Sequence, residues 1–125
     1  MLKSNDLNVL GTVLEACCEN PATGYFRDGY CSTIKDDFGT HVLCAILTQE
    51  FLEFTKSHGN DLSTPIPHWS FPGLKPGSKW CLCISRWLEA ELAGKAPLVV
   101  LEATHQKALE YTTLKLLQKY EAIVK

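Results

Sequence analysis

Proline and glycine gather in one stretch of this chain, and that stretch limits where regular structure can form. Residues 59–78 hold four of the six prolines and three of the eight glycines. The pairs Pro72-Gly73 and Pro76-Gly77 predict tight turns, because proline presets the first central residue of a turn and glycine permits a positive φ at the second. Loops of this length inside a compact domain are more often functional than short ones. The sequence therefore predicts a long but ordered connection.

Turn-forming residues also crowd the N-terminal third of the chain. They cluster at 20–24, 27–29 and 35–39. Only short strands fit between turn signals that are so closely spaced, and Asn8-Val9-Leu10 is one that we expect. Most of residues 11–39 is predicted to be ordered loop.

After residue 40 the pattern changes to alternating strands and helices. Apolar, β-favouring runs predict the strands, and capping residues followed by helical periodicity predict the helices. Within a strand at 79–85, alternation would place Trp80 and Leu82 on one side and Cys81 and Cys83 on the other. The predicted elements are strands at 41–47, 79–85 and 97–102, a helix at 49–58 capped by Thr48 and ended by Gly59, a helix at 86–93 closed by Gly94, a helical turn from His105 capped by Thr104, and a helix from Thr113 to the C-terminus.

This order of elements predicts an α+β fold in a single compact domain, residues 1–125. We expect a small mixed β-sheet with helices packed against it and long ordered loops. The alternative is an α/β three-layer arrangement. The strand order stays open, because the connection between the last two predicted strands is barely long enough for a parallel crossover. With 46% apolar residues among 125, the chain can build a hydrophobic core without relying on disulfides or a metal.

Charge and hydropathy narrow the partners and the compartment. Twelve basic against 14 acidic residues give a net charge of −2, and this balance argues against a nucleic-acid partner or a membrane surface. The N-terminus has no apolar core of a signal peptide, and no apolar stretch approaches the ~20 residues of a membrane span. We therefore expect a cytoplasmic protein with free thiols, and a disulfide framework is disfavoured.

The six cysteines are an unusual number for such a chain. No Cys-x-x-Cys pair connects them, so the standard zinc and dithiol redox motifs are missing. Cys44, Cys81 and Cys83 are the candidate metal ligands, with zinc as the candidate ion, and no other cofactor is expected. In the alternative interpretation, Cys81 and Cys83 are small apolar side chains buried beneath a helix.

The segment from Glu102 to His105 is a candidate catalytic site. It lies where a predicted strand ends and a helix begins, a usual place for ligand sites. His105 could act there as a general base or as a ligand, and Cys17 or Cys31 could be its partner as a thiolate nucleophile if they meet in space. The candidate catalytic residues are Cys31, His41, His105 and Glu102. In the plainer interpretation, His105 only occupies the first helical turn and Glu102 pairs with a basic neighbour.

Five further residues are candidates for binding a small molecule. They are Arg27, Asp28, Asn60, Asp61 and Trp80. The four polar residues stand at sharp turns and would suit a site wall, although such residues commonly satisfy local backbone groups instead. The tryptophan could line a pocket or simply fill the core.

Three functional hypotheses follow. The first is a small cytosolic enzyme or ligand-binding domain with a polar site of cysteine, histidine and glutamate beneath the 59–78 connection. The second is a metal-binding protein with cysteine and histidine ligands. The third is a non-catalytic interaction module that exposes Trp69 and Phe71 to a protein partner.

Several strings in the chain resemble one known family. They are Asn8-Val9-Leu10-Gly11, Thr23-Gly24-Tyr25-Phe26-Arg27-Asp28-Gly29, His41 with Cys44-Ala45, Gly59-Asn60-Asp61-Leu62-Ser63-Thr64-Pro65, Phe71-Pro72-Gly73-Leu74-Lys75-Pro76-Gly77, Trp80-Cys81-Leu82-Cys83 and Val100-Leu101-Glu102-Ala103-Thr104-His105. Together they are similar to the domain of unknown function 2237 family, uncharacterised bacterial-type proteins of about this length. The resemblance covers residues 8 to about 117 and implies no activity. The chain departs from the family pattern with Ala16 for a proline, Cys18 for a small polar residue, and Tyr30 for a second cysteine beside Cys31.

Overall fold

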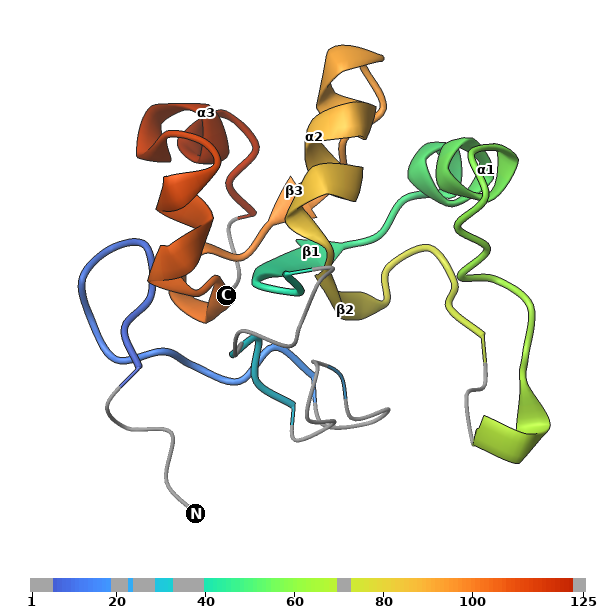
Figure 1. The fold of residues 1–125 in the computed structure, drawn as a ribbon, viewed down its shortest axis with the longest axis horizontal. Coiled ribbons are helices and arrows are strands. Elements are labelled where there is room, and N and C mark those ends of the chain that lie inside the picture. The colour runs from blue at the N-terminus through green and yellow to red at the C-terminus, as the bar shows by residue number, and fades with distance from the viewer. Residues whose placement is uncertain (1–5, 19–22, 24–28, 33–39, 70–72, 123–125) are drawn as a thin grey trace.

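Three short strands form the centre of the part of the chain that the structure describes. The structure is a computed structural model that describes residues 6–18, 23, 29–32, 40–69 and 73–122. The strands lie in the order β2-β1-β3, so that the first strand along the chain is the central one (Figure 1). Both pairings are antiparallel. The strands are β1 (Leu43–Ile46), β2 (Lys79–Leu82) and β3 (Leu98–Val99).

The predicted α+β class is confirmed. The strand pairings are antiparallel, whereas a three-layer α/β fold is built on parallel strands joined by crossovers, so that alternative is wrong for the described residues. A parallel contribution comes from a single bridge between Val99 and Glu121, where the chain returns beside β3 after its last helix.

The helices α1, α2 and α3 lie along one side of the strands, and the described residues of the N-terminal segment, 6–18, 23 and 29–32, lie along the other (Figure 1). The strand residues that face the helices are apolar, and Leu43, Trp80 and Leu82 belong to the main core. Cys44 and Cys81 belong to a second, smaller buried cluster on the other face. The helical elements are α1 (Gln49–Ser57), α2 (Ile84–Leu92), α3 (Leu114–Lys119) and the 3-10 turns at Pro67–Trp69, Leu101–Ala103 and Gln106–Glu110.

Both ends of helix α1 carry the capping residues that the sequence predicts. The Thr48 hydroxyl oxygen accepts a hydrogen bond from the Phe51 backbone N–H at 3.1 Å, which satisfies one of the donors that a helix start leaves open. Gly59 follows the helix with φ of +88°, a backbone conformation that glycine adopts without cost.

Helix α2 begins two residues earlier than predicted, and this changes the position of Cys83. The strand ends at Leu82, and Cys83 is the N-cap of the helix. The backbone N–H of Ile84 donates to the carbonyl oxygen of Thr40 at 3.2 Å, a contact that turns the chain away from the sheet. The prediction that Cys81 and Cys83 share a strand face is therefore wrong.

Near the N-terminus, a turn replaces the predicted strand at residues 8–10. Asn8 is fully buried, and its Oδ1 accepts from the backbone N–H groups of Leu10 and Thr12. Its Nδ2 donates to the carbonyl oxygen of Glu102 at 3.0 Å. A single bridge joins Asn8 to His105. The Asn8 side chain thus organises the turn and joins it to the 3-10 turn that follows β3.

The last third of the chain is less regular than predicted. The strand expected at 97–102 is only Leu98–Val99 and passes into a 3-10 turn. His105, and not Thr104, is the N-cap of the following turn. Helix α3 stops at Lys119, because the chain must extend again to pair with Val99.

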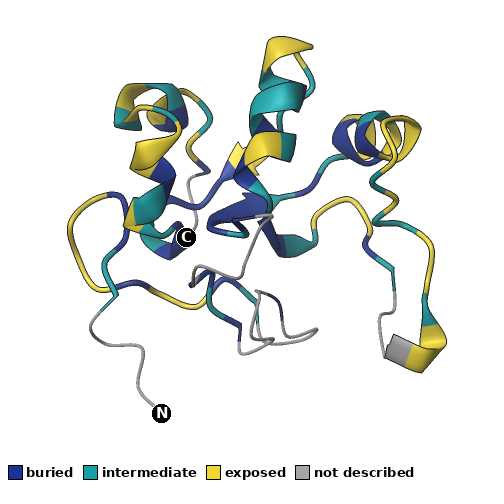
Figure 2. Cartoon of the chain, in the orientation of Figure 1, coloured by how far each residue is buried: buried dark blue, intermediate teal, exposed yellow. Residues whose placement is uncertain are grey.

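Burial is concentrated in the strands and the inner faces of the helices, as the dark blue segments in Figure 2 show. Phe51, Trp87 and Leu117 bring one fully buried side chain from each helix into the core. A core of this kind agrees with the apolar content of the chain.

The long connection is ordered at its described turns. Gly73 and Gly77 have φ of +81° and +92°, as the Pro-Gly pairs predict. A side chain at position 73 would collide with the carbonyl oxygen of Ser63, so only glycine fits there. The backbone N–H of Leu74 donates to the carbonyl oxygen of Leu62 at 2.8 Å, which joins the two arms of the connection.

Candidate functional site

A cleft of about 490 Å³ opens where β2 ends and α2 begins. Its residues come from the entrance to β1, the segment after α1, β2 and the first two turns of α2. Such a volume lies in the range of pockets that hold small molecules. The lining residues are His41, Asn60, Leu62, Trp80, Leu82, Cys83, Ser85, Arg86 and Glu89.

The side of the cleft formed by α2 is polar. The Cys83 sulfur lies 3.0 Å from the Ser85 hydroxyl oxygen. One turn later, the Arg86 guanidinium donates to a Glu89 carboxylate oxygen at 3.3 Å and to the carbonyl oxygen of His58 at 3.0 Å. Both ends of the Arg86–Glu89 ion pair are about one-third exposed. The arginine is therefore held in place while its charge still borders the cleft.

Leu62, Trp80 and Leu82 form the apolar part of the lining. Trp80 and Leu82 point to the same side of β2 because residues two apart in a strand share a face. Asn60 is fixed beside them, with its Nδ2 donating to the Thr55 hydroxyl at 3.0 Å. The cleft is thus lined both by hydrogen-bonding groups and by aromatic and aliphatic side chains.

The structure brings some of the sequence candidates together in this cleft and separates others. His41, Asn60 and Trp80 line it, together with Cys83, which the sequence suggests as a metal ligand. Arg27 and Asp28 lie outside the described residues.

Asp61 performs a local role. Its carboxylate accepts hydrogen bonds from the Thr64 hydroxyl and from the backbone N–H groups of Ser63 and Thr64. The bonds from Thr64 and Ser63 hold the pKa of this carboxyl below its usual value. This is the Asx-type turn that competes with the ligand-binding interpretation of such residues.

The junction at Glu102 and His105 is not among the residues that line the cleft. The His105 Nδ1 accepts a hydrogen bond from the Lys107 backbone N–H at 3.0 Å and so caps the turn that follows. Its Nε2 lies 3.8 Å from a carboxylate oxygen of Asp6. Glu102 contributes its backbone carbonyl, which accepts from Asn8 and Glu15.

The partly buried position of His105 predicts a pH dependence of stability. Burial lowers the pKa of His105, and the neighbouring Asp6 carboxylate offsets this only in part. An unfolded histidine takes up its proton near pH 6.5. As the pH falls below that value, the unfolded state binds more protons than the folded state, so the stabilisation present above it is lost.

We therefore expect the free energy of unfolding of the wild type to fall more steeply between about pH 7.5 and about pH 5 than that of His105→Asn. Asparagine keeps an N-cap acceptor but does not titrate. Urea unfolding at the two pH values measures the difference, and parallel pH profiles for the two proteins would refute this role of His105.

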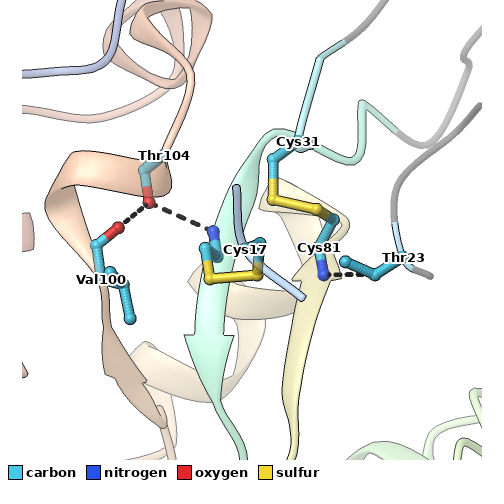
Figure 3. The surroundings of a disulfide bond; sticks show 7 residues. Cys17, Thr23, Cys31, Cys81, Val100 and Thr104 are labelled. Carbon is cyan, nitrogen blue, oxygen red and sulfur yellow. Dashed lines mark hydrogen bonds between the residues drawn. A yellow bond between two sulfur atoms is a disulfide. The ribbon is translucent and has the colours of Figure 1, made fainter. Parts of the chain in front are cut away.

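The prediction of free thiols is wrong for four of the six cysteines. Disulfides join Cys17 to Cys44 and Cys31 to Cys81, with Cα–Cα distances of 5.6 and 5.2 Å, and Figure 3 shows the two bonds beside each other. Cys31 is fully buried in its bond and is not a free nucleophile in this state. Cys44 and Cys81, two of the suggested metal ligands, lie opposite each other on neighbouring strands.

Two threonines fix the strands that carry these cysteines (Figure 3). The Thr104 hydroxyl donates to the carbonyl oxygen of Val100 at 2.8 Å and accepts from the Cys44 backbone N–H at 3.1 Å. The Thr23 hydroxyl accepts from the Cys81 backbone N–H at 2.8 Å. Both side chains are fully buried, so these bonds lie away from competing water.

Sequence reasoning missed the α2 side of the cleft. Arg86 and Glu89 are three residues apart and therefore adjacent on a helix surface, a spacing that could have identified them. Ser85 gave no such signal. Trp69 and Phe71 are suggested as an exposed patch, and this stays a prediction because the Trp69 side chain and residue 71 lie outside the described residues.

One family model matches residues 7–121, and its description reads "Uncharacterized protein conserved in bacteria (DUF2237)". The chain belongs to this family. The resemblance in the sequence strings is thereby confirmed, and both the cleft and the four bonded cysteines lie within the DUF2237 match. No curated protein matches this DUF2237 chain. Within its described residues, no helix is long and apolar enough to cross a membrane.

Proposed function

We propose that this protein is a small cytoplasmic ligand-binding protein and that the cleft at the start of α2 is its binding site. The observation that carries the proposal is the cleft itself, about 490 Å³ in volume with a mixed polar and apolar lining. Ligand pockets of this size combine an apolar surface with a few placed polar groups. The partner is then a small organic molecule and neither a nucleic acid nor a membrane, in keeping with the net charge of −2.

The lining supports a ligand with two chemically different ends. Trp80 and the two leucines would pack against an apolar or aromatic part. Arg86 and Glu89 would orient a polar end, because both side chains are held by hydrogen bonds before any ligand arrives. Such preorganisation lowers the entropy cost of binding.

Two groups in the cleft could carry chemistry. Cys83 is a free, half-buried thiol, and His41 lines the same cleft. A cysteine and a histidine can together perform nucleophilic catalysis, in which the imidazole accepts the thiol proton and the thiolate attacks an electrophilic atom of the substrate. The catalytic roles that we propose therefore belong to Cys83 and His41, with Asn60 and Trp80 as binding residues.

A library of chloroacetamide fragments tests the binding site. We expect a small subset of fragments to label Cys83 about tenfold faster than their intrinsic reactivity predicts, because noncovalent contacts in the cleft hold them beside the thiol. Intact-protein mass spectrometry followed by peptide mapping measures the rates. Cys18 is the matched control within the chain, since it is also free and half-buried.

Arg86→Ala should change which fragments are selected. Lys56→Ala is the matched variant, because Lys56 lines a separate cleft of about 370 Å³ and should leave the selection unchanged. If Cys83 reacts with every fragment at the rate that intrinsic reactivity alone gives, as Cys18 does, the cleft does not bind small molecules and the proposal fails.

A further inference from the structure

Four buried cysteines meet at one point of the fold, although the chain brings them from four separate places. Cys44 on β1 and Cys81 on β2 are direct cross-strand partners. Cys17 and Cys31 approach the same face of the sheet from the N-terminal segment. The exposed fraction of each residue is 5% or less. This convergence is independent of the cleft at the start of α2.

Three of the four sulfur atoms already lie close together, and the fourth is bonded to one of these three. Those of Cys17, Cys31 and Cys81 all lie within 4.8 Å of one another, and the Cys44 sulfur is bonded to that of Cys17. A zinc ion with Zn–S distances of about 2.3 Å needs four sulfurs about 3.8 Å apart at the corners of a tetrahedron. To reach these corners, the bonded sulfurs must separate, and the Cys44 sulfur must approach those of Cys31 and Cys81 by rotation of its side chain.

From this arrangement we infer that Cys17, Cys31, Cys44 and Cys81 form a tetrathiolate zinc site when both disulfides are reduced. Reduction of each disulfide consumes two electrons and two protons, supplied by a dithiol reductant that is itself oxidised to a disulfide. One Zn²⁺ then binds four thiolates and releases the four thiol protons to solvent. Oxidation by two equivalents of a small disulfide reverses the sequence: the two protein disulfides form, each oxidant takes up two electrons and two protons to become a dithiol, and the zinc ion is released.

The backbone at three of the four cysteines is already fixed by hydrogen bonds. Cys44 and Cys81 donate their backbone N–H groups to the Thr104 and Thr23 hydroxyls, and Cys17 donates its own to the carbonyl oxygen of Gly29 at 2.7 Å. Because these hydrogen bonds do not involve sulfur, they can persist when the disulfides open. The ligands would then be held near their binding positions before the metal arrives.

The surroundings favour zinc over a hard cation. Val100, Ala103 and Ala122 pack around the sulfurs and offer no carboxylate or carbonyl-bearing side chain. Magnesium and calcium require oxygen ligands, whereas four thiolates select a soft or borderline ion. A closed site with four protein ligands is the arrangement of structural zinc.

Both states would serve the same structural purpose. Either the two disulfides or the zinc ion would join the N-terminal segment to β1 and β2. In a reducing compartment, where disulfides do not persist, the metal would take over this role. The cleft is lined by Cys83 and not by these four residues, so the zinc site can be tested separately from ligand binding.

The first experiment uses the wild-type chain. The protein is reduced with a phosphine under argon, freed of small molecules, and titrated with Zn²⁺ against a chromophoric chelator. We expect one zinc ion per chain, and Co²⁺ in its place should give the intense visible bands of tetrahedral thiolate coordination. Alkylation followed by peptide mapping should show that zinc protects four cysteines, residues 17, 31, 44 and 81, and leaves Cys18 and Cys83 reactive.

The second experiment compares single variants. Cys31→Ser and Cys44→Ser should weaken zinc binding more than about 100-fold, since each removes a direct ligand, whereas Cys18→Ser and Cys83→Ser should bind zinc as the wild type does. Should a ligand variant fail to fold, the alkylation pattern of the wild type still decides the question. The inference is overturned if the reduced wild type binds no zinc when one equivalent of Zn²⁺ per chain is added. It is also overturned if zinc protects Cys18 or Cys83 from alkylation and leaves residues 17, 31, 44 and 81 reactive. Neither result alters the fragment selectivity at Cys83 on which the ligand-binding proposal depends.

Discussion

Replacing Cys31 and Cys81 together by alanine should lower the free energy of unfolding by about 4 kcal/mol in the absence of metal. The bond joins residues 50 positions apart, and opening so large a loop returns a corresponding amount of chain entropy to the unfolded state. The same reasoning gives about 3.5 kcal/mol for the Cys17–Cys44 bond, whose separation is 27. Urea unfolding monitored by circular dichroism, with a chelator and without reductant, measures both losses.

The matched control removes two cysteines but no disulfide. Cys18→Ala combined with Cys83→Ala should change the free energy of unfolding by less than about 1 kcal/mol, because both residues are free and only half-buried. Intact mass before and after reduction counts the disulfides in every variant. If the Cys31/Cys81 variant lost no more stability than the Cys18/Cys83 control, the Cys31–Cys81 bond would not stabilise the protein.

The helix boundaries that the sequence predicts correctly depend on residues next to them. Thr48 caps α1, Gly59 follows its end, and Gly94 follows α2 with φ of +74°. Each of these residues acts on backbone groups within about one turn, so a local pattern contains the necessary information. The α+β class follows in the same way from alternating strand and helix patterns.

The start of α2 could not be located by the same reasoning. The run from Cys81 to Ile84 favours a strand, and nothing in it is a standard N-cap. The helix begins at Ile84, whose backbone N–H donates to Thr40, more than forty residues away. A contact across that distance overrides the local preference, and it moves Cys83 from the strand face into the cleft.

The same limit applies to the candidate site. The sequence identifies His41, Asn60 and Trp80 as residues of interest, but their assembly with Arg86 depends on how α2 packs beside β2. Cys17 and Cys44 likewise have no recognisable spacing, and their disulfide depends on the fold of the N-terminal segment over the sheet. Chemically useful residue types can be selected from a sequence, whereas their convergence is a property of tertiary structure.

Trp87→Ala should destabilise the protein by about 3 to 5 kcal/mol. Trp87 is fully buried on α2, and its ring lies edge-on to that of Tyr120 with the centroids 5.2 Å apart. Its Nε1–H donates to the carbonyl oxygen of Pro97 at 3.1 Å. The substitution therefore opens a large cavity between α2 and the end of the chain and also leaves a buried carbonyl without this donor.

A second variant at position 87 separates the effect of the cavity from that of the hydrogen bond, and an exposed residue of the same helix provides the control. Trp87→Phe fills most of the volume but cannot donate to Pro97, so it should lose only about 1 to 3 kcal/mol. Leu92→Ala, on the same helix but 88% exposed, should lose less than about 0.5 kcal/mol. Urea unfolding of the three variants gives the order directly. If Trp87→Ala were no more costly than Leu92→Ala, α2 would not be anchored through Trp87, and the cleft formed by its first two turns would lose the support that this side chain provides.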